Sequence, residues 1–266
     1  MKLIDVHTHL THAKFQSSID DLLKEVDEKM YAVICNGLEP VSNRQILEFS
    51  KNHPTIKAAL GIYPIDAICS ILPDDFTLKV TKFDVDEEIK FISQMAEEKR
   101  LIAIGECGLD HYWITGEQYQ KLQEYVFENL IEIAKRNDLP VIVHSRKAEK
   151  RTAEILAHHQ IKKVDFHCFG GRTKLASRLA ENEDWCFSIP ANVRRNQAFA
   201  KMLKILPKEK ILTETDAPYL SPVPGNTNSP LNVQETIIFW SEIRKEDPAR
   251  TSELIYNNYQ RLFNAE

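Results

Sequence analysis

The feature that most constrains the fold is an alternation of short apolar runs with longer amphipathic segments along the whole chain. The runs are rich in valine, isoleucine and leucine, as buried strands are, and the segments between them have the apolar spacing of helices. Strands that alternate with helices are joined by right-handed crossovers, which build a parallel sheet. We therefore expect strands near residues 3–7, 31–36, 57–61, 101–106, 140–144, 163–167, 185–189 and 210–215.

Helices are expected in the segments that follow these strands. The signals are clearest in the long segment that begins after Gly116 and ends shortly before Pro140. Within it, an apolar stripe that includes Leu122, Tyr125 and Leu130 predicts the face packed on the sheet. The expected helices cover residues 19–29, 42–52, 86–99, 117–137, 148–159, 173–181, 197–206, 234–246 and 251–263.

Eight strand–helix units in 266 residues predict a single α/β domain over residues 1–266. Its expected fold is a TIM barrel, or (β/α)8 barrel, which typically needs about 250 residues. An open, doubly wound sheet is the alternative, but no GxGxxG pattern follows the first expected strand. The longest irregular stretch, residues 63–83, either covers the mouth of the barrel or is a long connection.

Composition is that of an ordinary globular protein, with 43% hydrophobic and 27% charged residues. No apolar run approaches the ~20 residues of a membrane span, and the N-terminus lacks the pattern of a secretory signal. The five cysteines are scattered without CxxC spacing, which favours a reducing compartment, so we expect a cytoplasmic protein with no membrane or obligate protein partner. A net charge of −5 argues against a protein that coats nucleic acid, but not against an enzyme acting on one phosphate at a time.

Two histidines one residue apart, His7 and His9, end the first expected strand. Side chains at positions i and i+2 of a strand point the same way and lie about 6.6 Å apart along the backbone. Two neutral imidazoles at that spacing can bind one transition-metal cation. Taken alone, however, the pair is explained equally well by ordinary core or surface histidines.

Metal-binding residue types recur at the ends of four later strands. Glu106, His144 and His167 end the fourth, fifth and sixth expected strands, and Asp216 follows the eighth. Because a barrel brings the carboxyl ends of its strands to one face, these side chains should converge there with the histidine pair. Four imidazoles and two carboxylates are enough for two divalent ions about 3.5–4 Å apart, with Glu106 placed to bridge them.

Each of these residues has a structural alternative when it is considered singly. His144 or His167 can be a buried histidine with satisfied hydrogen bonds, and Glu106 can pair with a lysine, since a buried unpaired carboxylate is costly. Asp216 can cap a turn before Pro218. The coincidence of all six residue types at strand ends is what predicts a metal site.

Five segments that contain these residues resemble, in order, the motifs of the TatD family of metal-dependent deoxyribonucleases, within the amidohydrolase superfamily. The segments are IDVHTHL at residues 4–10, GECGLD at 105–110, PVIVHSR at 140–146, HCF at 167–169 and TETDAP at 213–218. The resemblance implies a barrel of the metallo-dependent hydrolase type and hydrolysis of DNA phosphodiester bonds by a metal-activated water. It also implies that the metal ligands are His7, His9, Glu106, His144, His167 and Asp216. Among these, Glu106 and Asp216 are the expected catalytic residues, with Asp216 accepting a proton from the attacking water.

The chain departs from the family pattern at two places. Tyr63 stands where the family commonly has the histidine of a Gly-x-His-Pro segment, and residues 224–230 lack the arginine often found after the last strand. A tyrosine can donate a hydrogen bond to a phosphate oxygen, but it carries no imidazolium charge. Both departures fall where a phosphate-bearing substrate would be bound, and we expect Tyr63 to contact it.

Basic residues follow the fifth and seventh expected strands. Arg146, Arg194 and Arg195 would lie on the rim of the mouth and make it locally basic in an acidic protein. Our hypothesis is that these arginines bind the substrate phosphate in place of the missing loop arginine. Asp110 and Ser145 are candidates either to orient metal ligands or to stabilise turns.

Three functions follow from these residues: a DNase, a small-molecule amidohydrolase that cleaves a phosphoester, lactone or amide on the same barrel, and a binding protein without catalysis. Many amidohydrolases carry a carbamylated lysine on the fourth strand, so Glu106 at that place favours the TatD-like enzyme. Retention of all six ligand types argues against the binding protein. Mixed imidazole and carboxylate ligands suit Zn, Mn, Fe, Co or Ni, and suit Mg less well.

Overall fold

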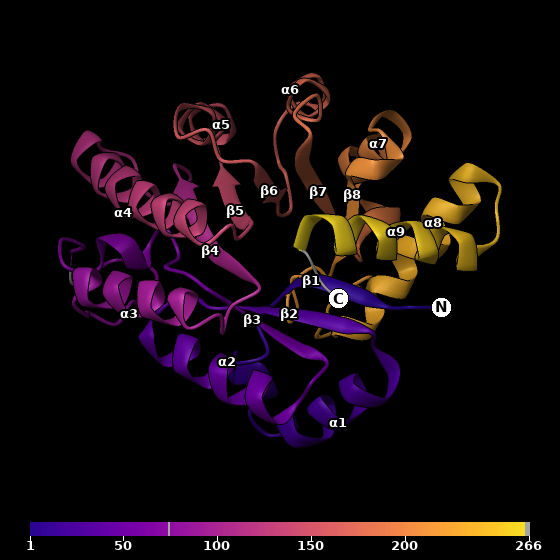
Figure 1. Ribbon diagram of the computed structural model, residues 1–266, viewed down its shortest axis with the longest axis horizontal. Coiled ribbons are helices and arrows are strands. Elements are labelled where there is room, and N and C mark those ends of the chain that lie inside the picture. The colour runs from indigo at the N-terminus through magenta and orange to yellow at the C-terminus, as the bar shows by residue number, and fades with distance from the viewer. Residues whose placement is uncertain (74, 264–266) are drawn as a thin grey trace.

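The computed structural model describes residues 1–73 and 75–263. Eight parallel strands lie in the order β1 to β8, and helices surround them in a TIM barrel (Figure 1). The strands are β1 (Ile4–Thr8), β2 (Ala32–Asn36), β3 (Ile56–Leu60), β4 (Ala103–Asp110), β5 (Val141–Arg146), β6 (Lys163–Phe166), β7 (Asp184–Pro190) and β8 (Ile211–Glu214). This confirms the expected fold and each expected strand.

Helices follow the strands as expected, with ends displaced by a few residues. The α-helices are α1 (Ile19–Lys29), α2 (Pro40–Asn52), α3 (Val85–Glu97), α4 (Glu117–Arg136), α5 (Glu149–His158), α6 (Thr173–Leu179), α7 (Gln197–Ile205), α8 (Val233–Arg244) and α9 (Pro248–Phe263). Short 3-10 helices are η1 (Ala13–Phe15), η2 (Asp66–Ile68), η3 (Val193–Arg195), η4 (Lys208–Lys210) and η5 (Pro230–Asn232). Residues 264–266, the end of the expected single domain, lie outside the described residues.

Strand β4 is longer than expected, and this affects the mouth of the barrel. It continues beyond Glu106 because it pairs with β5 as far as Asp110, which lies opposite Arg146. By contrast, β6 and β8 end before His167 and Asp216, so these two residues lie in the first turn of the following loops. The candidate ligands thus lie at, or just beyond, the carboxyl ends of their strands.

The barrel closes between its last and first strands through side chains as well as main chain. The Asp5 carboxylate on β1 accepts hydrogen bonds from the backbone amide of Thr215, at 3.0 Å, and from its hydroxyl. The backbone amide of Asp216 donates to the carbonyl of His7 at 2.9 Å. These contacts fix the loop after β8 beside the end of β1.

Two apolar layers hold the barrel together. One lies between the strands and the surrounding helices. The other fills the lower interior of the barrel, where Ile4, Ile34 and Leu212 from the strands pack against Tyr259 and Leu262 of α9. Helix α9 therefore closes the amino-terminal end of the barrel and leaves its carboxyl end as the open one.

The expected inner face of α4 is only partly correct. Leu130 is fully buried, but Tyr125 is 48% exposed and its hydroxyl donates to Asp86 on α3. Gln123 takes a buried place instead, where its side-chain amide binds both the backbone N–H and the carbonyl of Asp110. A polar residue faces inward there because the end of β4 has main-chain groups to satisfy.

The irregular stretch of residues 63–83, of which residue 74 lies outside the described part, contains η2 and packs beside the barrel mouth. Its Ile65, Ile68 and Leu72 form a small apolar cluster with Ile114 from the β4–α4 connection. This cluster fixes one wall of the mouth. In the described part of the chain, no helix combines the length and the apolar character that crossing a bilayer requires.

Candidate metal centre

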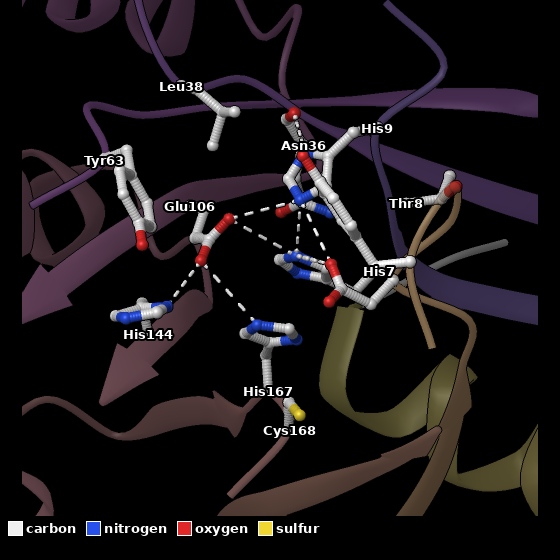
Figure 2. A network of polar contacts seen from close by, with 12 residues as sticks. His7, Thr8, His9, Asn36, Leu38, Tyr63, Glu106, His144, His167 and Cys168 are labelled. Atoms are coloured by element: carbon white, nitrogen blue, oxygen red, sulfur yellow. Dashed lines mark hydrogen bonds and ion pairs between the residues drawn. The ribbon is translucent and has the colours of Figure 1, made fainter. Parts of the chain in front are cut away.

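The six candidate ligands converge at the open end of the barrel, as the spacing of strand ends predicts. Their ligand atoms form three overlapping groups within 4.8 Å: His7, His9 and Glu106; Glu106, His144 and His167; and His7, His167 and Asp216. Glu106 belongs to two of these groups. It comes from β4 and lies among side chains from β1, β5 and the loop after β6 (Figure 2).

One side of the centre is built from β1 and the loop after β8. The Nε2 atoms of His7 and His9 lie 3.2 Å apart, which follows from their i and i+2 positions on one strand. Glu106 Oε2 lies 3.4 Å from both nitrogens, and Asp216 Oδ1 lies 3.7 Å from that of His7 and 3.3 Å from that of His9. Two ring nitrogens and two carboxylate oxygens thus point at one small volume.

The other side of the centre is built from β5 and the start of the loop after β6. The second oxygen of Glu106, Oε1, lies 2.8 Å from His144 Nδ1 and 3.7 Å from His167 Nε2. The two carboxylate oxygens of Glu106 therefore face different pairs of imidazoles (Figure 2). A carboxylate in that position can bind two cations at once.

Each of three ligand histidines has a partner on the ring nitrogen that faces away from the centre. His144 Nε2 lies 3.1 Å from Asp110 Oδ2, and His167 Nδ1 lies 2.9 Å from Glu214 Oε2. His9 Nδ1 lies 3.1 Å from the carbonyl oxygen of Asn36. Such contacts fix ring orientation and tautomer, as is usual for metal-binding histidines.

Sequence reasoning had named Asp110 for this role but had missed Glu214. The signal that could have found Glu214 is its place at the end of the eighth strand, where the other candidate ligands also gather. Glu214 also accepts hydrogen bonds from the Cys168 amide and the Ser188 hydroxyl. The other candidate, Ser145, has a buried hydroxyl with no hydrogen-bond partner among the described residues.

The protonation states in the centre are strongly displaced. Burial and the nearby His167 lower the pKa of His7 to about 3, so this imidazole stays neutral with a lone pair available to a cation. Burial alone would lower the pKa of His167 as well, but the Glu214 carboxylate outweighs it and raises that pKa to about 10. A cation binding at His167 must displace a proton, and metal binding is accordingly expected to release protons.

The carboxylates are kept ionised by the imidazoles around them. Burial would raise the pKa of Glu106, but His7 and His144 outweigh it and hold that pKa well below its usual range. Burial likewise would raise the pKa of Asp216, and the contacts with His9 and His167 lower it. Ionised oxygen ligands beside a neutral imidazole are the state that a divalent cation needs.

The donor set fits a transition-metal cation. Imidazole nitrogens mixed with carboxylate oxygens suit Zn, Mn, Fe, Co and Ni. Further, His7 directs Nε2 at the centre, 3.4 Å from Glu106 Oε2, while its Nδ1 is buried without a hydrogen-bond partner in the described residues. Two of the three ligand groups share Glu106, and the third joins His7 and His167 to Asp216, an arrangement that bound cations would explain.

Two glycines allow the backbone segments at the centre to approach closely. A Cβ atom at Gly61 would lie 2.3 Å from the carbonyl oxygen of Glu106, and one at Gly108 would lie 2.0 Å from that of His144. Gly108 also has a φ of 142°, which side-chain-bearing residues rarely adopt. Any larger residue at either position would displace a candidate ligand.

Of the four expected substrate contacts, Tyr63 and Arg146 lie beside the centre. The Tyr63 ring meets the His144 ring edge to face at 5.0 Å, and its hydroxyl lies 3.4 Å from Asp110 Oδ2. Burial, followed by the charges of Glu106 and Asp110, raises the pKa of Tyr63, which therefore remains a hydrogen-bond donor. Arg146, two residues after His144, is exposed.

The other two expected contacts, Arg194 and Arg195, form hydrogen bonds with groups of the same chain. Both terminal nitrogens of Arg194 donate to the Glu242 carboxylate on α8, at 2.9 and 2.6 Å. Arg195 donates to the carbonyl oxygens of Ser221 and Pro222 in the loop after β8. The sequence does not reveal these partners, because they lie more than twenty residues away along the chain.

A cavity of about 560 Å³ opens beside His9. His9 and His12 line it on the β1 side, and Leu38 and Phe49 line it on the side of β2 and α2. It offers room for a substrate group next to one ligand of the centre.

Known proteins share the sequence pattern and the fold of this chain. The model of the family described as "TatD related DNase" matches residues 4–264. The deoxyribonuclease TATDN3 of Homo sapiens is 30% identical and covers 98% of this chain and 94% of its own length. The metal-dependent hydrolase YabD of Bacillus subtilis is 27% identical, with 98% of both chains covered. The crystal structure of YJJV, a TatD homologue from Escherichia coli, shares the fold with a TM-score of 0.83, at 24% identity, covering 99% of this chain and 98% of its own.

Proposed function

The chain belongs to the TatD-related DNase family of metal-dependent hydrolases, and on that premise we propose that it cleaves phosphodiester bonds of DNA with two divalent cations. The observation that carries the proposal is the position of Glu106. One of its oxygens faces His7 and His9, and the other faces His144 and His167. A shared carboxylate between two imidazole pairs is suited to a pair of cations.

We assign the ligands to the two cations by their positions. His7, His9 and Asp216 would hold one cation and His144 and His167 the other, with the two oxygens of Glu106 within reach of both. Cations bound there supply Lewis acidity, which lowers the pKa of water and polarises the scissile phosphoryl group. Whether both sites fill with Zn, Mn, Mg, Fe, Co or Ni is decided by metal analysis of the purified protein.

The chain's own residues provide the proton transfers. Asp216 has an ionised carboxylate, 17% exposed, and is therefore reachable from the mouth. In the proposed reaction a water oxygen attacks phosphorus while Asp216 accepts the water proton. As the bond from phosphorus to the leaving oxygen breaks, Asp216 returns that proton to the leaving oxygen. Tyr63, which stays protonated, donates a hydrogen bond to a non-bridging phosphate oxygen.

The placement of the arginines refines the expected phosphate contacts. Arg146 is available at the mouth, whereas Arg194 and Arg195 are held by Glu242 and by two loop carbonyls. We therefore assign phosphate binding to Arg146 and assign Arg195 to the support of the loop after β8. The mouth thus has fewer unpaired arginines than the sequence implied. Hydrolysis of a small phosphoester, lactone or amide is therefore the second candidate function.

One assay separates the two functions. Purified protein, stripped of metal and reloaded with Mg²⁺, Mn²⁺ or Zn²⁺, is given single-stranded DNA, a generic phosphate ester and a lactone panel. Cleavage of DNA that Glu106→Gln abolishes supports the proposal. Intact DNA with every metal, beside turnover of an ester or lactone, would replace it with the small-molecule function.

A cytoplasmic location is part of the proposal. Cys35, Cys69, Cys107, Cys168 and Cys186 are free thiols, and all but Cys168 are buried. Free thiols are the usual state in a reducing compartment. The proposed partner is DNA or another phosphoester, with no obligate protein subunit.

A further inference from the structure

An exposed aromatic pair lies at the mouth, directly after β4. Tyr112 is 51% exposed and Trp113 is 38% exposed, although both are large rings that usually lie inside a fold. Their ring centroids are 5.2 Å apart, with planes at 82°. The guanidinium carbon of Arg146 lies 3.8 Å from the Tyr112 ring centroid and 5.5 Å from that of Trp113.

The Arg146 guanidinium packs against these two rings instead of forming a salt bridge with a described residue. No carboxylate lies within ion-pair distance of its guanidinium among the described residues, unlike the case of Arg194, which is paired with Glu242. We call Tyr112, Trp113 and Arg146 the aromatic platform.

The aromatic platform is connected to the metal centre by a single carboxylate. Asp110 Oδ1 accepts hydrogen bonds from the backbone amides of Tyr112 and Trp113, both at 2.9 Å. Its other oxygen, Oδ2, is the partner of His144 Nε2 at 3.1 Å. The Asp110 side chain thus contacts both the turn that carries the two rings and the candidate metal ligand His144.

The turn is also anchored by an apolar contact of the residue that follows it. Ile114, the residue after Trp113, is buried in the small apolar cluster with Ile65, Ile68 and Leu72. An anchored backbone that still exposes two aromatic rings loses little conformational freedom when a ligand binds. Packing therefore explains the position of the turn but not the exposure of its rings.

We propose that the aromatic platform is a stacking site for a nucleobase of single-stranded nucleic acid whose phosphodiester lies at the metal centre. This inference rests on the proposed phosphodiesterase function. Aromatic rings stack on unpaired bases of any sequence, and a guanidinium beside them binds the adjoining phosphate or stacks itself. A duplex hides the faces of its bases, so such a site favours single strands.

The positions of the platform and of the cavity define the path of a bound strand across the mouth. The platform follows β4 and β5, whereas the cavity of about 560 Å³ lies beside His9 on β1 and Leu38 after β2. In an eight-stranded barrel, β1 and β5 lie on opposite sides. A strand bound on the platform at one side therefore crosses the metal centre toward the cavity at the other.

The three tryptophans allow a direct test of stacking. Trp185 and Trp240 are 3% and 1% exposed, so quenching of tryptophan fluorescence by acrylamide reports mainly on Trp113. The probe is hexathymidylate with phosphorothioate linkages, which resists hydrolysis, added to the zinc-loaded full chain. The matched probe is an abasic phosphorothioate of the same length and charge. Thymidylate should protect Trp113 from acrylamide, and the abasic strand should not.

Binding affinities give the second readout. The wild-type protein should bind thymidylate at least about tenfold more tightly than the abasic strand, because stacking adds to affinity at each base. Trp113→Ala and Tyr112→Ala should bring that ratio close to one, and Trp113→Phe should retain most of it. Tyr31→Ala is the control, since Tyr31 is 41% exposed at the opposite end of the barrel, and it should leave the ratio unchanged.

The outcomes separate this inference from the proposed function. Equal affinities for thymidylate and the abasic strand in the wild-type protein, or a Trp113 equally accessible with and without thymidylate, overturn the stacking site even where DNA is cleaved. A base-dependent affinity lost in Trp113→Ala supports the stacking site even where DNA stays intact, in which case the proposed chemistry is what fails. Thermal unfolding of each variant confirms that it is folded before its ratio is compared.

Discussion

Asp110 Oδ2 lies 3.1 Å from His144 Nε2, and the opposite ring nitrogen of His144 lies 2.8 Å from Glu106. The imidazole is thus held at both ends. Because an ionised carboxylate can only accept, both ring nitrogens of His144 donate here, and the hydrogen bonds to Asp110 and Glu106 outweigh burial and raise the pKa of His144. A cation at Nδ1 would replace the proton shared with Glu106, while Asp110 would keep the proton on Nε2. Asp110 also accepts the amides of Tyr112 and Trp113, so one side chain sets both a candidate ligand and the rim of the mouth.

Changing Asp110 to asparagine should weaken metal binding or activity by about 10- to 100-fold, the usual cost of removing a partner that orients a ligand. Titration of the metal-free protein with Zn²⁺ in a calorimeter measures the affinity. Ser145→Ala is the matched control, because the Ser145 hydroxyl has no partner among the described residues and the variant should stay within about twofold. Equal losses in the two variants would contradict the orienting role of Asp110.

Changing Glu106 to glutamine should reduce the metal content from two ions per chain to one or none. Glutamine keeps the shape of the side chain but removes the negative charge that attracts both cations. Elemental analysis after dialysis against limiting Zn²⁺ gives the stoichiometry, and the loss of activity should exceed about 100-fold. A variant that still holds two ions would show that Glu106 is not the bridge.

Changing Tyr63 to phenylalanine should lower kcat/KM for a diester about 10- to 100-fold, the cost of one hydrogen bond to a charged group. The pKa of Tyr63 is raised by burial, so the hydroxyl remains a donor and the ratio of the two rates should be constant between about pH 6 and pH 9. Rates of both proteins across that range provide the test. A ratio that changes with pH would mean that Tyr63 itself titrates.

Changing Arg194 to alanine should leave KM for single-stranded DNA within about twofold. The Glu242 carboxylate neutralises this guanidinium, which therefore has little charge left for a phosphate. Arg146→Ala, which removes an unpaired cation at the mouth, should raise KM several-fold in the same assay. The reverse order of effects would restore Arg194 as a phosphate contact.

Asp66 should make the metal-free protein less stable as the pH rises. Burial, then the charges of Glu39 and Glu106, raise the pKa of Asp66 to about 7, against about 3.9 in an unfolded chain. Between these values the folded state keeps a proton that the unfolded state has lost, so the free energy of unfolding falls with increasing pH. Asp66→Asn removes this effect.

The melting temperature of Asp66→Asn minus that of the wild type should therefore be smallest near pH 4 and increase until about pH 7. Chelated protein is used because a cation at Glu106 would change the charge that Asp66 experiences. A difference for Asp66→Asn that does not change with pH would exclude the titration.

Much of the candidate centre could be predicted from residue spacing alone. His7 and His9 share one side of a strand, and the parallel order of strands brings Glu106 and His144 to the same end of the barrel. These relationships depend on the two-residue period of strands and on the common direction of β1 to β8, both of which are present in the order of residues along the chain.

The partners of these side chains were decided by the tertiary structure. Glu214 meets His167 across 47 residues of sequence, and Arg194 meets Glu242 across 48. Such pairs depend on how far each strand and helix extends and how the elements pack, which local patterns do not specify. The amino-acid sequence thus determined the fold and the residue types that gather at its open end. Only the packed barrel decided which charges neutralise one another and which, such as Arg146, remain available to a substrate.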